Sequence, residues 1–195
     1  MGTRDQILDA AAEVMHTRGL ARTTTKEIAR AAGYSEATLY KHFRDKTDLF
    51  LAVLTERVPS FSAVLADIAH DPEAHPLRDN LIAIARGALA FYHESFPISA
   101  SVFSEPTLLA AHRDALTARK AGPHKASAAL ARYLRAEQKL GRVAHHVDCD
   151  AIAGLLLGAC LHHAFLTSFA QHPLTPAAAR THATTTVDAL LPSLV

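Results

Sequence analysis

The chain contains 195 residues with a formal net charge of +1 at pH 7, and 49% of its residues are apolar. These totals suit one globular domain of ordinary length, or a small module joined to a larger one, and allow a buried core. The near-neutral charge neither favours nor excludes a nucleic-acid partner. A high alanine content with only 8 glycines favours helix.

Three classes of protein are disfavoured by the same sequence. The N-terminal residues "MGTRDQILD" are charged where a secretory signal would be apolar. The longest apolar run, residues 151–161, is too short to span a bilayer. Cys149 and Cys160 form no CxxC pair and imply no disulfide framework. We therefore expect a soluble cytoplasmic protein without a membrane segment.

The first twenty residues predict an amphipathic helix. Thr3 and Gln6 have the spacing of a capping box, in which each side chain satisfies a free backbone amide. Gly19 suits the residue that follows a helix. One face of the helix carries the apolar residues Ile7, Leu8, Ala11, Val14 and Met15.

Three further helix starts follow before residue 50. Thr24 and Glu27 form a second capping-box pattern, and Gly33 closes that helix. Ser35 is a suitable N-cap for the next short helix, and Asp45 for the one after it. The first two of these helices, joined through "AGYS", fit a helix-turn-helix, whose tight turn Gly33 would supply.

The remainder of the chain predicts longer helices and no strands. Apolar residues recur at helical spacing over residues 77–92 and 126–134. Asp148 is positioned to cap an apolar helix, and Thr175 followed by Pro176 marks the last helix start. We expect an all-α protein: a three-helix helix-turn-helix DNA-binding domain over residues 1–46, then a larger helical ligand-binding and dimerisation domain over residues 47–195.

Charge around the helix-turn-helix gives a weak additional signal for nucleic acid. Residues 22–46 contain six basic and three acidic side chains, a net charge of +3 on a chain of +1. The basic residues are Arg22, Lys26, Arg30, Lys41, Arg44 and Lys46.

The segment "TTKEIARAAGYSEATLYKHFRDKTDL" resembles the DNA-binding signature of the tetracycline-repressor (TetR) family. The resemblance covers about the first 55 residues and rests on Thr24, Ile28, Ala29, Ala32, Gly33, Ser35, Leu39, Tyr40, His42, Phe43, Lys46 and Leu49. It implies that Tyr40 and Lys46 contact DNA phosphates while Leu39 and Phe43 belong to the core. The alternative for Tyr40 is a half-buried aromatic with its hydroxyl in water. Tyr34 departs from the small aliphatic residue usual in this turn.

The exposed start of the third helix supplies the candidates for reading bases. Lys41 could meet guanine, Thr38 a thymine methyl or a phosphate, and Glu36 a cytosine amino group. The alternative is a solvated helix face. The full set of expected DNA contacts is Thr24, Thr25, Ser35, Glu36, Ala37, Thr38, Tyr40, Lys41, His42 and Lys46.

Neither a metal site nor an active site is expected. Thirteen histidines occur, and the densest cluster lies at residues 145–150, but it contains no HxxxH or CxxC pair. Asp148 is better explained as a helix cap. No catalytic triad, Walker or glycine-rich nucleotide pattern is present, so we expect a protein that is not an enzyme and has no cofactor.

The central helices carry aromatic and polar residues that could surround a small molecule. The resemblance implies an apolar cavity whose ligand loosens DNA binding, and an apolar pocket with a few polar groups is what such a site needs. The candidates are Phe91, Tyr92, His93, Phe96, Phe103, His112, Leu155 and His162. The alternative for each is plain core packing.

The last two helices are the expected dimer interface. The helix over residues 151–169 is apolar nearly all round, so one face can meet its own core and another a partner. Gly154 and Gly158 would allow close approach, and Val187 and Leu190 would add an apolar stripe from the last helix.

We therefore expect a homodimeric repressor that binds a pseudo-palindromic DNA operator and is released by a small, mostly apolar ligand. Two alternatives remain open at this point. One is a helical ligand-binding protein or enzyme that no longer uses its DNA-binding module. The other is a DNA-binding regulator without a ligand.

Overall fold

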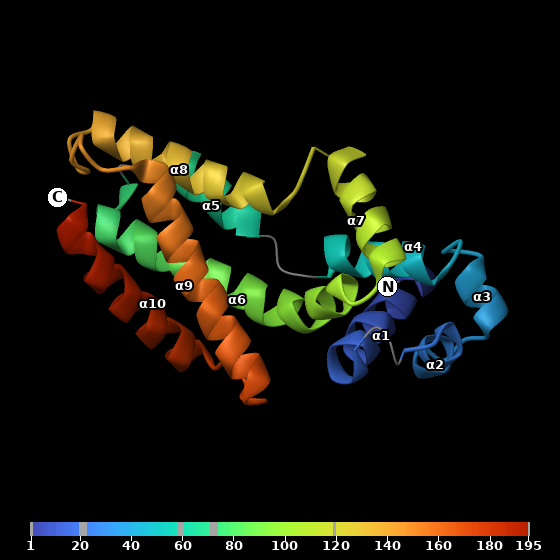
Figure 1. The fold of residues 1–195 in the computed structure, drawn as a ribbon. Coiled ribbons are helices and arrows are strands. Elements are labelled where there is room, and N and C mark those ends of the chain that lie inside the picture. Colours follow the sequence, from blue (N-terminus) through green and yellow to red (C-terminus); the bar gives the residue numbers. More distant parts are fainter. Residues whose placement is uncertain (1, 20–22, 58–60, 71–73, 119, 195) are drawn as a thin grey trace. The chain divides into compact units, whose positions relative to one another are not determined.

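The computed structural model describes residues 2–19, 23–57, 61–70, 74–118 and 120–194, and every regular element within these residues is a helix (Figure 1). The all-α expectation is confirmed. The helices are α1 (Thr3–Arg18), α2 (Thr25–Ala31), α3 (Glu36–Tyr40), α4 (Lys46–Glu56), α5 (Phe61–His70), α6 (Leu77–Phe103), α7 (Pro106–Ala118), α8 (Pro123–Lys139), α9 (Cys149–Phe169) and α10 (Pro176–Leu190), followed by a 3-10 turn, η2 (Leu191–Ser193).

The chain divides into two compact units. The first comprises Met1–Pro59 and Glu94–Ala121, and the second comprises Ser60–His93 and Gly122–Val195. This division differs from the expected boundary after residue 46, because α4 shares its core with α1. Leu49, Phe50 and Val53 of α4 are buried in one cluster with Ile7 and Leu8 of α1.

Ion pairs join α1 to the C-terminal end of α4 in the first unit. Arg4 donates two hydrogen bonds to the Glu56 carboxylate, at 2.8 and 2.7 Å. Arg57 bridges Asp9 at 2.6 Å and Asp5 at 3.0 Å. The hydrogen bond from Arg57 lowers the pKa of Asp5. These contacts supplement an apolar core that already orients the two helices.

Most of the predicted helix ends are confirmed. The Thr24–Glu27 capping box is present, the Ser35 and Asp45 side chains each accept the amide of the residue three positions later, and Gly19 adopts a positive φ of 73° after α1.

The capping box predicted for Thr3 and Gln6 is wrong. α1 already begins at Thr3, and its N-cap is Gly2, which provides no side-chain cap. The Gln6 side-chain oxygen instead accepts a hydrogen bond from the Tyr34 hydroxyl. The Gln6 side chain therefore bonds to a residue 28 positions away and does not form the capping box with Thr3.

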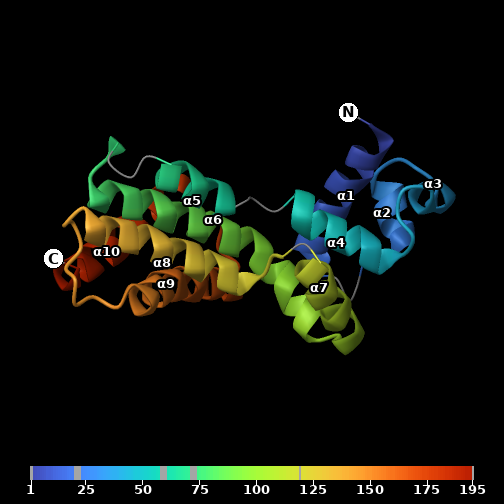
Figure 2. The ribbon, with the colours of Figure 1, turned by 90° about the horizontal axis from the view of Figure 1, so that it is seen from above.

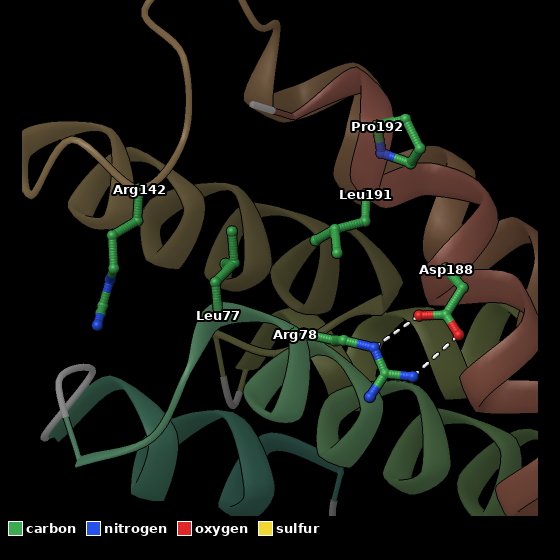
Figure 3. Close-up of a pocket in the computed structure, with 6 residues that line it drawn as sticks. All are labelled: Leu77, Arg78, Arg142, Asp188, Leu191 and Pro192. Atoms are coloured by element: carbon green, nitrogen blue, oxygen red, sulfur yellow. Dashed lines mark hydrogen bonds and ion pairs between the residues drawn. The ribbon is translucent and has the colours of Figure 1, made fainter.

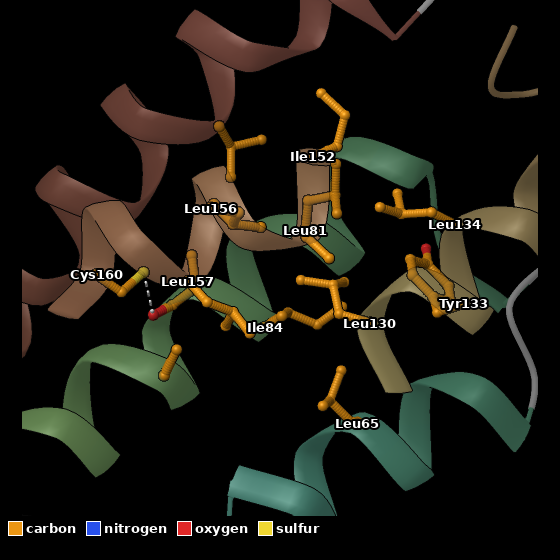
Figure 4. Close-up of a cluster of buried hydrophobic side chains, with 14 of the residues drawn as sticks. Leu65, Leu81, Ile84, Leu130, Tyr133, Leu134, Ile152, Leu156, Leu157 and Cys160 are labelled. Atoms are coloured by element: carbon orange, nitrogen blue, oxygen red, sulfur yellow. Dashed lines mark hydrogen bonds between the residues drawn. The ribbon is translucent and has the colours of Figure 1, made fainter. Parts of the chain in front are cut away.

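The second unit groups α5, α8, α9 and α10 with the first part of α6 (Figure 2). Its core consists mainly of leucine, isoleucine and alanine side chains, with a few valine, cysteine and tyrosine side chains, and Figure 4 shows part of it. The Cys160 thiol of α9 donates to the Ala85 carbonyl of α6 at 3.6 Å, and burial raises its pKa to about 12. This cysteine is therefore a packing residue that stays protonated.

The second unit also contains a helix cap at Asp148 and a buried ion pair at Glu137. Asp148 caps α9 by accepting the amides of Asp150 and Ala151, which confirms its predicted role. Glu137 of α8 has no exposed surface, and its carboxylate accepts two hydrogen bonds from Arg142, at 2.5 and 3.0 Å. A buried carboxylate of this kind depends on its partner to compensate the loss of water.

Candidate nucleic-acid interface

The turn between α2 and α3 is shaped by local backbone bonds. The Tyr34 amide donates to the Ala29 carbonyl at 2.8 Å, and Gly33 adopts a positive φ of 78° that favours glycine. Ser35 then accepts the Thr38 amide and starts α3. The predicted helix-turn-helix is therefore present, with α3 beginning directly after the turn.

Buried residues hold α3 in place and leave its other face open. Leu39 has no exposed surface, and Phe43, in the turn after α3, is nearly fully buried among residues of α1, α2 and α4. Ala37, Lys41 and His42 are exposed. A short helix with an apolar anchor and an open small or basic face can present side chains to a DNA groove.

Tyr40 lies at the edge of this face, with 47% of its surface exposed. Its hydroxyl is 3.1 Å from the hydroxyl of Thr25, the first residue of α2. Thr25 is buried, and its hydroxyl also donates to the Glu36 carboxylate at 2.5 Å. Thr25 and Glu36 were expected to face DNA, and the structure shows that both also take part in an internal network.

Several basic side chains of α2, of α4 and of the segment after α3 are exposed or partly exposed. Lys26, Arg30, Lys41 and Arg44 are exposed, and Lys46 is partly exposed at the first position of α4. Arg44 lies 3.7 Å from Asp48, so part of its charge is neutralised within the protein. Arg22, counted in the sequence as a further basic residue, lies outside the described residues. Thr24 is exposed at the N-cap of α2, where it completes the capping box.

Two tertiary contacts of this interface were not predicted from the sequence. One is the Tyr34–Gln6 hydrogen bond, which ties the turn to α1. The other is the Thr25–Glu36–Tyr40 network. Neither pairing has a helical or turn spacing, so the chain carries no local signal for them.

The candidate ligand residues are distributed over both units. Phe96, Phe103 and His112 belong to the first unit, and the remaining five belong to the second. Phe103 is 74% exposed, and His112 packs edge-on against Phe50 with ring centres 6.5 Å apart. Burial lowers the pKa of His112. Leu155 of α9 is 59% exposed, and His162, seven residues further along the same helix, is exposed as well.

Three of the candidates are consecutive residues of α6 in the second unit. Phe91 and Tyr92 form an edge-to-face pair with ring centres 5.2 Å apart. The neighbouring His93 accepts the Leu174 amide through Nε2 at 3.3 Å, and burial raises the pKa of Tyr92. Among the described residues, the buried Nδ1 of His93 has no hydrogen-bond partner.

A separate open pocket of about 420 Å³ lies elsewhere in the second unit (Figure 3). Leu77, Leu191 and Pro192 provide its apolar lining, and Arg78 of α6 pairs with Asp188 of α10 at 2.7 Å. None of the eight candidate ligand residues lines this pocket.

The outer face of α9 is mostly apolar and exposed, and it also carries the exposed His162. Its exposed large side chains are Leu155, Leu161, Phe165, Leu166 and Phe169. Gly154 and Gly158 are exposed on the same side, and a Cβ built on either would meet nothing within 4 Å. By length and composition alone α9 could also cross a membrane, but core helices of soluble proteins pass the same test.

The expected contribution of α10 to a dimer interface needs correction. Val187 has no exposed surface, because it is buried in the core of its own unit. Leu190 is partly buried against the same core. The assignment of Val187 to a partner contact is therefore wrong. The apolar stripe of α10 fastens that helix to its own core.

In the described part of the chain, no group of three or more His, Cys, Asp or Glu side chains is placed to hold a metal ion. His163 of α9 instead stacks on His182 of α10, with ring centres 3.8 Å apart.

Comparison with known proteins matches the N-terminal helices to one family. Residues 7–53 match the model described as bacterial regulatory proteins of the tetR family. The HTH-type transcriptional regulator YvkB of Bacillus subtilis is 38% identical over 69 residues, which are 35% of this chain. The match spans only 36% of the length of YvkB.

Solved structures extend the similarity in fold to nearly the whole chain. GusR of Salmonella enterica is 25% identical with a TM-score of 0.70, covering 98% of this chain and 95% of that one. The transcriptional regulator FadR of Bacillus subtilis, solved in complex with stearoyl-CoA, is 16% identical with a TM-score of 0.70, covering 98% of this chain and 99% of that one. Residues 7–53, which contain the capped helix-turn-helix and its open α3 face, therefore match the tetR family of bacterial regulatory proteins, and nearly the whole chain shares its fold with solved transcriptional regulators.

Proposed function

We propose that this chain is a cytoplasmic transcriptional regulator that binds double-stranded DNA through α3 and the residues around it. The observation that carries the proposal is the open face of α3, where Ala37 and Lys41 are exposed while Leu39 is buried beneath them. Side chains on such a face can reach base edges, and Lys46 and Tyr40 at its borders can reach phosphates. Ser35, Thr38 and His42 are the remaining candidates on this surface.

The test is fluorescence anisotropy with labelled duplex DNA, including the DNA that flanks the chain's own gene. We expect affinity to fall linearly with salt on logarithmic axes, because each phosphate contact releases counterions. Lys46→Ala should reduce that slope by about one. Lys139→Ala, which removes an exposed lysine at the end of α8, is the matched control and should leave the slope unchanged. Absence of salt-dependent binding would refute the proposal.

We further propose a homodimer in which the outer face of α9, with Gly154 and Gly158, meets the same face of a second copy. One five-residue α3 reads few base pairs, so specific recognition calls for two half-sites and a two-fold protein. A pseudo-palindromic operator follows from this symmetry. The exposed leucines and phenylalanines of α9 form an apolar face of the kind that partners cover.

A small, mostly apolar effector is the finer part of the proposal. FadR, similar in fold, was solved with stearoyl-CoA, a ligand with a long apolar chain. In this chain the Phe91–Tyr92 pair provides apolar surface, and Nδ1 of His93, which no described residue contacts by a hydrogen bond, provides a polar group. A thermal-shift screen of fatty acids and acyl thioesters, followed by anisotropy with DNA, tests it. A compound that raises the melting temperature should also release DNA; binding without release would contradict the regulatory role.

A further inference from the structure

Three side chains of the DNA-binding unit form a connected hydrogen-bond network. The buried Thr25 of α2 has its hydroxyl oxygen 2.5 Å from a carboxylate oxygen of Glu36 and 3.1 Å from the hydroxyl of Tyr40. Glu36 and Tyr40 are the first and last residues of α3. Thr25 therefore connects the two ends of the helix through one oxygen atom.

Counting protons fixes the direction of this network. A threonine hydroxyl carries one proton, and an ionised carboxylate can only accept. Thr25 therefore donates to Glu36, and its oxygen is left as an acceptor. The contact between the two hydroxyls then requires Tyr40 to be the donor. In the DNA-free protein the proton of the Tyr40 hydroxyl consequently points inward, to Thr25.

A DNA phosphate, like the carboxylate, offers only acceptors at neutral pH. If Tyr40 is to donate to a phosphate, it must first give up its bond to Thr25. The Thr25 proton stays with Glu36, so the oxygen of Thr25 then loses its donor. Every phosphate contact made by Tyr40 is thus weakened by the cost of that broken bond.

We propose that Thr25 and Glu36 act as positioning residues that hold the Tyr40 proton away from DNA and so lower affinity for DNA of any sequence. The inference rests on the proposed function and adds a restraint built into the same surface. A restraint on phosphate contact favours selectivity, because phosphate contacts carry no sequence information.

A double-mutant cycle on DNA of arbitrary sequence tests the network. Tyr40→Phe is measured in the wild-type chain and in Thr25→Val, which is nearly the same shape but has no hydroxyl. The N-cap of α2 is Thr24, so this change leaves the helix cap intact. We expect Tyr40→Phe to weaken binding about fivefold more in Thr25→Val than in the wild type, the factor for one net hydrogen bond of about 1 kcal/mol. Equal losses in both backgrounds would overturn the proposal.

Variants at Glu36 separate the network from simple charge and from misfolding. Glu36→Ala removes the acceptor, so Thr25 can donate to Tyr40, and the Tyr40→Phe loss should again be about fivefold larger. In Glu36→Gln the amide oxygen still accepts from Thr25. Affinity should rise because a negative charge is lost, but the Tyr40→Phe loss should match the wild type. Thr25→Ser, which keeps the hydroxyl, should also match the wild type. If Glu36→Gln and Glu36→Ala changed that loss equally, charge alone would explain the effect and the network would be refuted.

A DNA-free readout keeps this inference separate from the proposed function. In the free protein, the carboxyl 13C resonance of Glu36 and the 13Cζ resonance of Tyr40 should both shift on Thr25→Val and return in Thr25→Ser. These shifts are expected even if the wild-type chain shows no salt-dependent DNA binding, which would refute the function but not the network. Resonances that stay unchanged in Thr25→Val would refute the network whether or not DNA binds.

Discussion

The outer face of α9 offers a sharp test of the dimer through Gly158. Successive helical residues are about 100° apart, which places Gly158 near the middle of the exposed arc bounded by Leu161 and Leu166. In the single chain a Cβ at Gly158 would meet nothing within 4 Å. Gly158→Leu should therefore be harmless to the isolated subunit and damaging only where a second copy approaches.

Gly158→Leu should stabilise the isolated subunit but destabilise the dimer. Within one subunit, replacing an exposed helical glycine by leucine should stabilise the fold by about 0.8 kcal/mol through helix propensity. In a closely packed two-fold interface, the same leucine occurs twice and overpacks each site by about 1–3 kcal/mol. The dimer should lose about 2–6 kcal/mol in total, which is a rise in its dissociation constant of about 30-fold or more.

Sedimentation velocity across a concentration series measures the dissociation constant, and urea unfolding of dilute protein measures the stability of the subunit. Ala83→Leu serves as the control, since it adds a leucine at an exposed position of α6 in the same unit. We expect weakened dimers for Gly158→Leu alone. A dimer as tight as the wild type would place the interface elsewhere. A destabilised subunit would show instead that the α9 face is covered by the chain itself.

Three further predictions concern stability. Arg142→Met should cost about 3 kcal/mol in urea denaturation, because the buried Glu137 carboxylate loses the hydrogen bonds that Arg142 donates to it; a loss below about 1 kcal/mol would contradict this. Burial lowers the pKa values of His163 and His182, so these two side chains bind protons less readily in the folded chain than in the unfolded chain. The free energy of unfolding should then decrease as pH falls below about 6.5, and His182→Gln should flatten that decrease; a pH-independent wild type would argue against it. Gly33→Ala should cost about 1–2 kcal/mol by thermal unfolding, through its positive φ alone, since the added Cβ has open space; an unchanged melting temperature would show that the turn relaxes.

Features that depend on a few neighbouring residues were predictable from the sequence. The caps at Thr24, Ser35, Asp45 and Asp148 all formed as predicted. Each joins a side chain to a backbone amide two or three positions away, so no distant group is needed. The helix-turn-helix followed for the same reason, from Gly33 and the small residues beside it.

Tertiary structure decided the contacts between residues that are far apart in sequence. Thr3 and Gln6 have the spacing of a capping box, but the side-chain oxygen of Gln6 accepts a hydrogen bond from the Tyr34 hydroxyl instead. α9 is apolar on nearly every side, so its sequence could not say which face would be buried. Packing within the second unit buried Leu156 and Cys160 and left Gly158 on the open side. The same packing buried Val187 of α10 in its own core. Periodicity shows that a face is apolar, but whether it meets its own core or a partner depends on how the remaining helices fill the space around it.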